Sequence, residues 1–264
     1  MKIPHRDQTA WTRADLRAPT DEGYVLIALA PARPAVPTPL GRARASRGRE
    51  ALYQLGAELA RRPDVLEAAQ MRAVITAPGS ARGSSEPRWK DVLLVRTRAL
   101  PAALAVADQI DTASLPGSRK LVIAARSVRR IADVSHEGPG PYLLNFFTGP
   151  SVATTLNVWE HTAGWFQDET SLTNSTVLQP HQPDTPYTVI NHCSWPSWWR
   201  LILALTLKPS FHSFVLRRFR TVDVSPHPVL YRVVSQWPRA AASRAPSSAR
   251  PRRHAQPSAR PRTR

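Results

Sequence analysis

The stretch that decides the fold runs from Tyr142 to Val234. It contains, in order, "YLLNFFTG" (142–149), "VWEHTAGWF" (158–166), "STVLQP" (175–180), "YTVINHCSW" (187–195) and "HPVLYRVV" (227–234). The second segment lies in a stretch with helical spacing, and the other four have the composition of strands. A further helix is expected after Pro196, interrupted at Pro209, where Ser210 can cap a second piece. The order strand, helix, strand, strand, helix, strand predicts a split βαβ, or ferredoxin-like, unit.

The preceding part of the chain repeats this order in a weaker form. "YVLIALAP" (24–31) corresponds to the first strand, and "KDVLLVRT" (90–97) corresponds to the third. An internal repeat decides an architecture before any single motif does. We therefore predict an α+β fold in which two βαββαβ repeats pack their sheets together within one chain. The expected elements of the first copy are a helix at Glu50–Leu66, strands at Ala69–Thr76 and Lys120–Ala125, and a linker at Arg126–Gly140.

Four segments follow from this pattern. Residues 1–23 form a flexible lead-in, 24–135 the degenerate repeat, 136–237 the better preserved repeat, and 238–264 a basic tail. Arg239–Arg264 contains eight arginines and no acidic residue among Ala, Pro and Ser. Such a segment has too little apolar surface to offset its ordering entropy, so we expect it to be disordered. Its charge would attract nucleic acid only non-specifically, because it has no aromatic residue on which bases could stack.

Composition excludes several classes of protein. The 264 residues carry a net charge of +17 and are 42% hydrophobic, which is compatible with a globular domain. Cys193 is the only cysteine, which excludes intramolecular disulfides and thiolate metal clusters. The start "MKIPHRDQTAWTR" lacks the apolar core of a signal peptide, and the apolar stretch Leu201–Leu207 is too short to span a membrane. These features lead us to expect a cytoplasmic protein with no membrane partner.

The second repeat resembles the antibiotic-biosynthesis-monooxygenase-like domains of the dimeric α+β barrel superfamily. The resemblance covers about 93 residues and rests on the order of "LLNFF", "VWEHTAGWF", "STVLQP", "YTVINHCSW", "PSFHSF" and "HPVLYRVV". Members of this family pair two sheets into a barrel, usually between subunits. The resemblance therefore implies that this tandem chain makes a pseudo-dimeric barrel internally, as a monomer or a homodimer.

Some members of that family oxygenate aromatic, polyketide-like substrates with molecular oxygen and without metal or flavin. The resemblance thus implies a cofactor-independent monooxygenase that acts on a small, quinone-forming aromatic compound. Such a reaction needs an apolar pocket, a base, and neutral donors that hold the developing oxyanion. Fold alone does not establish this activity, because other members degrade haem or only bind small ligands.

Polar residues within the strands of the second repeat are the candidate catalytic groups. Asn145 interrupts an apolar strand, where it either makes a structural hydrogen bond or donates to a substrate oxygen. Asn191 and His192 are adjacent, so only one of them can point into the barrel. Alternation places Asn191 with Trp195, and we expect this pair in the pocket together with Phe147. His192 either acts as the base or packs under a helix.

Helical residues are weaker candidates. His161 and Trp165 meet at four-residue spacing, but they lie opposite the face that carries Leu156, Trp159, Ala163 and Phe166. We include His161 and Trp165 as substrate-binding candidates that rank below the strand residues, on the periphery of the fold. Haem-degrading relatives use a histidine on the second helix, but His212 is offset from that position.

Two other functions remain open. A non-catalytic small-ligand-binding protein on the same fold would have a cavity lined only by apolar side chains, whereas convergence of Asn145, Asn191 and His192 would favour the oxygenase. A nucleic-acid-binding protein would share the βαββαβ order, but neither "YTVINHCSW" nor "YLLNFFTG" provides the exposed aromatics of an RNA-recognition strand. No cofactor is expected for the leading interpretation.

Overall fold

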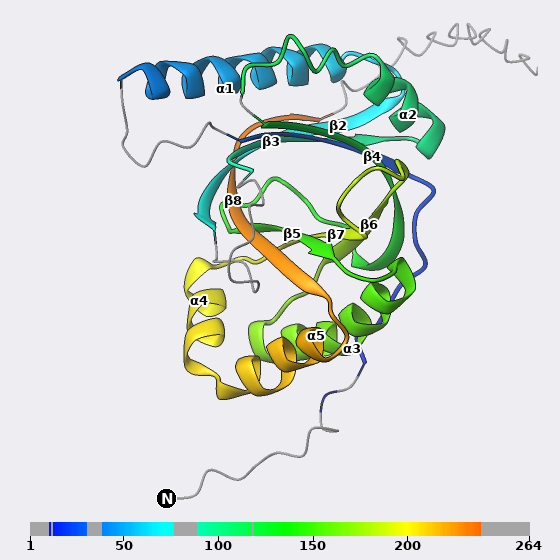
Figure 1. Cartoon of the computed structure of the whole chain (residues 1–264), viewed down its shortest axis with the longest axis vertical. Helices are drawn as coiled ribbons and strands as arrows, with labels where there is room; N and C mark the ends of the chain where they lie inside the picture. The colour runs from blue at the N-terminus through cyan, green and yellow to red at the C-terminus, as the bar shows by residue number, and fades with distance from the viewer. Residues whose placement is uncertain (1–10, 12, 31–38, 77–88, 118, 239–264) are drawn as a thin grey trace, which may run out of the picture.

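The computed structural model describes residues 11, 13–30, 39–76, 89–117 and 119–238. The basic tail expected to be disordered (Arg239–Arg264) and residues 1–10 and 12 of the N-terminal lead-in lie outside these residues. The elements follow the predicted order, with a π-helical segment, η1, between the last two helices (Figure 1). They are β1 (Gly23–Ala30), α1 (Pro39–Leu59), β2 (Val65–Thr76), β3 (Asp91–Thr97), α2 (Leu100–Asp108), β4 (Arg119–Ala132), β5 (Tyr142–Thr148), α3 (Val152–Thr170), β6 (Ser175–Pro180), β7 (Val189–Ser194), α4 (Trp198–Leu207), η1 (Phe211–Leu216), α5 (Arg217–Thr221) and β8 (Ser225–Pro238).

The strands close into one antiparallel barrel with the order β1-β3-β2-β8-β5-β7-β6-β4. Strands β1 to β4 come from the first repeat and β5 to β8 from the second, so each repeat contributes one continuous half. The helices α1 and α2 cover one side of the barrel, while α3, α4 and α5 cover the other (Figure 1). This arrangement confirms the predicted fold class of two ferredoxin-like repeats in an intrachain α+β barrel.

Two long strands join the halves, and both extend beyond their predicted ends. Strand β4 continues to Ala132 and pairs with β6, so the expected linker at Arg126–Gly140 is wrong over its first half. Strand β8 reaches Pro238 and pairs with β2 across two register shifts. The extensions carry several arginines and bulges, which hide the alternation of a strand. The pairing of β4 with β6 and of β8 with β2 satisfies the backbone N–H and C=O groups of these extensions.

The predicted helix at Glu50–Leu66 is also wrong at its C-terminal end. Helix α1 ends at Leu59, and β2 begins at Val65 after a short turn. Pro63 lies in that turn, where it has no N–H to donate and its ring would clash with the preceding helical turn. The chain therefore leaves the helix before Pro63 and enters the sheet earlier than its apolar spacing indicates.

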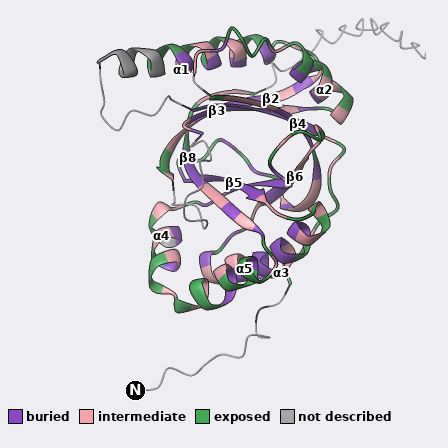
Figure 2. Ribbon diagram, in the orientation of Figure 1, coloured by how far each residue is buried: buried purple, intermediate pink, exposed green. Residues whose placement is uncertain are grey.

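Three apolar clusters fill the molecule. One lies inside the barrel and draws residues from both repeats, such as Leu26 and Phe146. A second lies between the first half of the sheet and α1 and α2, and a third lies between the second half and the helices α3 to α5. The strands are accordingly buried on both faces (Figure 2).

Hydrogen bonds between the repeats cross the barrel interior. The indole Nε1 of Trp89 donates to the Oη of Tyr187 at 2.8 Å, and the Tyr231 hydroxyl donates to the carbonyl oxygen of Trp89 at 2.8 Å. All three side chains are buried, so each bond satisfies a polar group that water cannot reach. No helix among the described residues has both the length and the apolar character needed to cross a membrane.

Candidate functional site

A cavity of about 370 Å³ lies between the second half of the sheet and its covering helices. Its floor is formed by β5, β7 and β8, and its roof by α3, α4 and η1. The volume lies within the range of small-molecule sites. The wall is mostly aliphatic and aromatic, and its polar members are Asn145, Thr162, Asn191, Cys193 and Thr206.

Two asparagines lie side by side on the floor of this cavity. Asn145 of β5 and Asn191 of β7 are direct cross-strand partners, so their side chains project from the same face of the sheet. The Ser175 hydroxyl donates to the Oδ1 of Asn191 at 2.6 Å, and the Asn191 Nδ2 donates one of its two hydrogens to the Cys193 Sγ at 3.7 Å. The Oδ1 of Asn145 is buried and has no hydrogen-bond partner among the described residues. A bound ligand with a hydroxyl or N–H group can therefore donate a hydrogen bond to this oxygen.

Aromatic rings shape the space around the asparagines. Trp195 lines the cavity, but its indole N–H donates to the Thr170 Oγ1 at 2.9 Å and is thereby satisfied. Phe147 also lines the cavity and stacks on Phe219 with a centroid separation of 5.4 Å. Both residues therefore present apolar ring surface to a ligand and provide no free polar group.

The described wall of the cavity carries almost no titratable group. Cys193 is the exception, and burial raises the pKa of its thiol, so the thiol stays neutral at physiological pH. No described lining residue is an acid, a histidine, a lysine or an arginine. The cavity can therefore bind and orient a substrate through neutral groups, but none of these side chains can act as a general base.

His192 faces the opposite side of the sheet from Asn191. It belongs to the interior of the barrel, together with its strand neighbour Ile190. The expectation that the pocket with Asn191 and Trp195 opens into the barrel is wrong, because their face of β7 packs under the helices. His192 is consequently not in this cavity, although its sequence neighbours on both sides are.

The two helical candidates lie outside the cavity. Trp165 is fully buried between α3 and η1, where its Nε1 donates to the Ser210 Oγ at 3.0 Å. Ser210 was expected to cap the helix that follows it, but its side chain makes no capping hydrogen bond and accepts from Trp165. His161 accepts from the Arg218 Nη2 at 2.9 Å and packs against Phe214. Neither His161 nor Trp165 lines the space next to Asn145.

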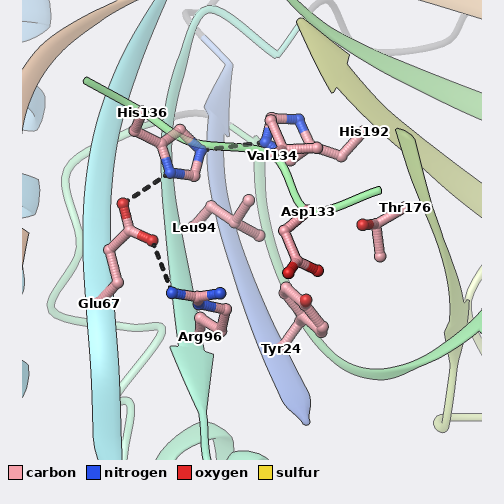
Figure 3. Close-up of a pocket in the computed structure, with 9 residues that line it drawn as sticks. All are labelled: Tyr24, Glu67, Leu94, Arg96, Asp133, Val134, His136, Thr176 and His192. Carbon is pink, nitrogen blue, oxygen red and sulfur yellow. Dashed lines mark hydrogen bonds and ion pairs between the residues drawn. The ribbon is translucent and has the colours of Figure 1, made fainter. Parts of the chain in front are cut away.

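A second polar cluster lies at one end of the barrel interior and contains His192 (Figure 3). His136 stands between Glu67 and His192, with Nδ1 2.8 Å from the Glu67 Oε1 and Nε2 3.0 Å from the His192 Nε2. The His192 Nδ1 lies 3.1 Å from the carbonyl oxygen of Leu143. The Nη2 of Arg96 lies 3.5 Å from the Oε2 of Glu67. The adjoining space of about 10 Å³ has room for one water molecule.

The contacts determine where the protons of this cluster lie. A carbonyl oxygen can only accept, so the Nδ1 of His192 carries a proton that it donates to Leu143. Burial and the charge of His136 lower the pKa of His192 to about 3, so its Nε2 is unprotonated and accepts from His136. Burial would raise the pKa of Glu67, but His136 and Arg96 outweigh it and hold this pKa below its usual range.

Haem and metal ions do not fit the described residues. His212 is exposed, and Val215 of the same segment lines the cavity in its place. The described wall therefore has no histidine that could bind iron and no arginine that could pair with propionates. No group of three or more His, Cys, Asp or Glu residues within the described ranges could hold a metal ion.

Sequence reasoning missed Glu67 and His136. Glu67 was predicted next to the end of a helix, and His136 was assigned to the linker between the repeats. Regular alternation from Val65 would place Glu67 under the helices, but a register shift between the two residues turns Glu67 into the barrel, so alternation could not have found it. His136 had no local signal either, because only closure of the barrel brings it against a residue 69 positions away.

Comparison with known proteins supports the fold. No protein-family model matches the sequence, and no curated protein matches it significantly. An anthrone oxidase-like protein of known structure aligns over 83% of this chain and 94% of its own, with 9% identity and a TM-score of 0.58. A provisionally assigned monooxygenase from Lactobacillus acidophilus aligns over 83% of this chain and 97% of its own, with 8% identity and a TM-score of 0.48. A dye-decolorizing peroxidase from Bacteroides thetaiotaomicron aligns over 85% and 96%, with 8% identity and a TM-score of 0.43. At these identities the first likeness shows the α+β barrel fold alone, and the other two carry no argument.

Proposed function

We propose that the chain is a cofactor-independent monooxygenase that oxidises a small, aromatic, polyketide-like compound to a quinone with molecular oxygen. The observation that carries this proposal is the pair Asn145 and Asn191, placed side by side on the floor of an otherwise apolar cavity. The likeness in fold to an anthrone oxidase-like protein agrees with the proposed substrate class.

The asparagines have different roles in this proposal. The unpartnered Oδ1 of Asn145 accepts from a ring hydroxyl of the substrate, which orients the ring system. Ser175 fixes the Oδ1 of Asn191, so its Nδ2 is the end that donates to the oxyanion. A preorganised donor of this kind stabilises charge that develops in the transition state. Trp195 and Phe147 provide the apolar walls between which the rings lie.

The oxidation is balanced without a bound cofactor. The substrate loses a proton from an activated methylene carbon, and the carbanion adds to dioxygen to give a peroxide anion. Protonation by solvent gives the hydroperoxide, which then loses water to leave a carbonyl. The substrate thus supplies four electrons, and one oxygen atom of dioxygen enters the product while the other leaves as water. Because the described cavity wall has no base, the substrate releases its first proton to solvent before it is enclosed.

Oxygen consumption by the purified chain tests the proposal. We expect uptake of dioxygen with anthrone- or naphthol-type compounds that is insensitive to chelators and requires no added flavin. Asn191→Ala should lower the turnover rate by about 100-fold, a typical cost of losing one oxyanion donor. Asn157→Ala is the matched control, because Asn157 is exposed on α3 and lies outside the cavity wall. A protein that is inert without added haem or flavin, or an Asn191→Ala variant with the parent rate, would contradict the proposal.

A second function is favoured by one observation, the absence of a titratable base from the described cavity wall. A non-catalytic protein that binds a small aromatic ligand needs only the apolar walls and the acceptor of Asn145. Tight binding of the test compounds without any oxygen uptake would support this function and exclude the oxygenase.

A further inference from the structure

Helix α4 presents an apolar stripe to solvent. Trp199, Leu203 and Leu207 recur at four-residue spacing, which places them along one side of the helix. Their exposed fractions are 73%, 49% and 71%, whereas Leu201 and Ala204 on the other side are buried in the core. Figure 2 shows that the helix lies at the edge of the molecule, away from α1 and α2. Three large apolar side chains in a row on one helix form an exposed patch of the kind that is typical of interaction surfaces.

The stripe adjoins the entrance of the candidate site. Ile202, Leu205 and Thr206 of the same helix line the cavity. Thr206 is also exposed, as is Ile75 near the end of β2, which lines the cavity too. A residue that is both exposed and part of the wall marks an opening. The apolar stripe therefore lies on the helix that forms one rim of the opening.

The segment that carries the stripe is basic. Trp198–Thr221 includes five lysines and arginines and no acidic residue. Lys208 forms an ion pair with Glu169 of α3, whereas Arg217 and Arg220 on α5 are exposed. A helical segment that combines exposed apolar residues with an excess of basic residues is typical of proteins that bind a membrane interface.

The chain itself has little with which to cover the stripe. Segments 77–88 and 239–264 contain no aliphatic residue larger than alanine and no Phe, Tyr, Trp or Met, apart from prolines. Segments 1–10 and 31–38 add only Met1, Ile3 and Val36. A second copy that used the same face would place one basic segment against another, which electrostatic repulsion opposes.

We propose that this face of α4 binds an anionic lipid surface, with Trp199, Leu203 and Leu207 inserted among the lipid chains. Surface binding of this kind requires no spanning segment, so the proposal replaces the expectation that the protein has no membrane partner. It does not depend on the oxygenase chemistry. It would bring the entrance of an apolar cavity to the phase in which apolar compounds dissolve.

Sedimentation with lipid vesicles tests this proposal. The full chain is mixed with vesicles of phosphatidylcholine alone, or of phosphatidylcholine with phosphatidylglycerol. The triple variant Trp199→Ser, Leu203→Ser, Leu207→Ser keeps every charge of the protein, including the basic tail. We expect the parent to bind the anionic vesicles, and the triple variant to bind them at least ~10-fold more weakly because it lacks the inserted apolar area.

Tyr53→Ser is the control, because Tyr53 is an exposed aromatic residue (42%) on α1, which covers the other side of the barrel. It should bind the anionic vesicles as the parent does. If the triple variant fails to fold, Leu207→Ser alone at the end of α4 should still weaken binding by ~3-fold.

Three results would overturn the proposal. Equal binding by the parent and the triple variant would show that basic residues alone attract the vesicles. Loss of parent dimers in the triple variant, with no vesicle binding by the parent, would identify a second copy of the chain as the partner. Binding to an acidic protein but not to vesicles would identify a protein partner.

Discussion

Acidification should destabilise the protein through one buried histidine. His192 is 2% exposed, and burial together with the charge of His136 lowers its pKa from the usual 6.5 to about 3. Between these two values the unfolded chain binds a proton at His192, whereas the folded protein does not. The contribution of neutral His192 to stability is therefore complete above pH ~6.5 and is lost as the pH falls towards ~3.

The size of the effect follows from the pKa difference. One pKa unit corresponds to about 1.4 kcal/mol, so the full difference corresponds to about 5 kcal/mol of unfolding free energy. At about pH 5, roughly 1.5 units below the unfolded value, the loss is about 2 kcal/mol. Contacts with His136 and Arg96 hold the pKa of Glu67 below its usual range, so Glu67 is mainly ionised at both pH 7 and pH 5.

Urea unfolding, followed by tryptophan fluorescence at pH 7 and pH 5, measures this loss in the parent and in His192→Gln. Glutamine can still accept from His136 and donate to the Leu143 carbonyl, but it does not titrate. His161 and His227, whose pKa values are also lowered by burial, are present in both proteins and cancel in the comparison. The parent should lose about 2 kcal/mol more than the variant between the two pH values. Equal losses of unfolding free energy in the two proteins would refute the assignment of His192 as a neutral, buried imidazole.

Two further substitutions test the packing. A Cβ at Gly140 would lie 1.7 Å from the carbonyl oxygen of Trp195, so Gly140→Ala should destabilise the protein by at least ~2 kcal/mol in thermal or urea unfolding. Gly138→Ala, whose nearest atom is 3.8 Å away, should leave the midpoint nearly unchanged; equal effects would contradict the close approach. Ser210→Ala removes the acceptor of the buried Trp165 indole and should cost ~1–3 kcal/mol in the same assay, and an unchanged midpoint would show that the bond is not needed.

The order of elements could be predicted from the sequence, and the family resemblance implied a barrel, but the strand extensions that close the barrel could not be predicted. Strands such as Asp91–Thr97 are short apolar runs with clear ends, and their bounds agree with the structure. Strands β4 and β8, which join the two repeats, contain stretches such as "RSVRRIA" (126–132), in which register shifts break the alternation. Their strand conformation depends on pairing with the other repeat, which is a long-range effect that local sequence does not encode.

The side of the sheet on which the candidate site lies could not be predicted either. Alternation correctly grouped Asn191 with Trp195 on a common face. It could not decide which face meets the helices, because both faces of β5 and β7 are buried and both carry apolar residues. Only the assembled barrel separates Asn191 from His192 by placing them on opposite sides of one sheet.

A crystal structure with a bound hydroxylated anthraquinone, the proposed class of product, would show whether the asparagine cavity is the substrate site. The ring system should occupy the cavity between the sheet and α3 and α4, against Trp195 and Phe147. A ring hydroxyl should lie within about 3 Å of the Oδ1 of Asn145, the distance of an ordinary hydrogen bond. A ligand bound inside the barrel beside His192, or one that leaves the Asn145 amide without a partner, would contradict the assignment of this cavity as the substrate site.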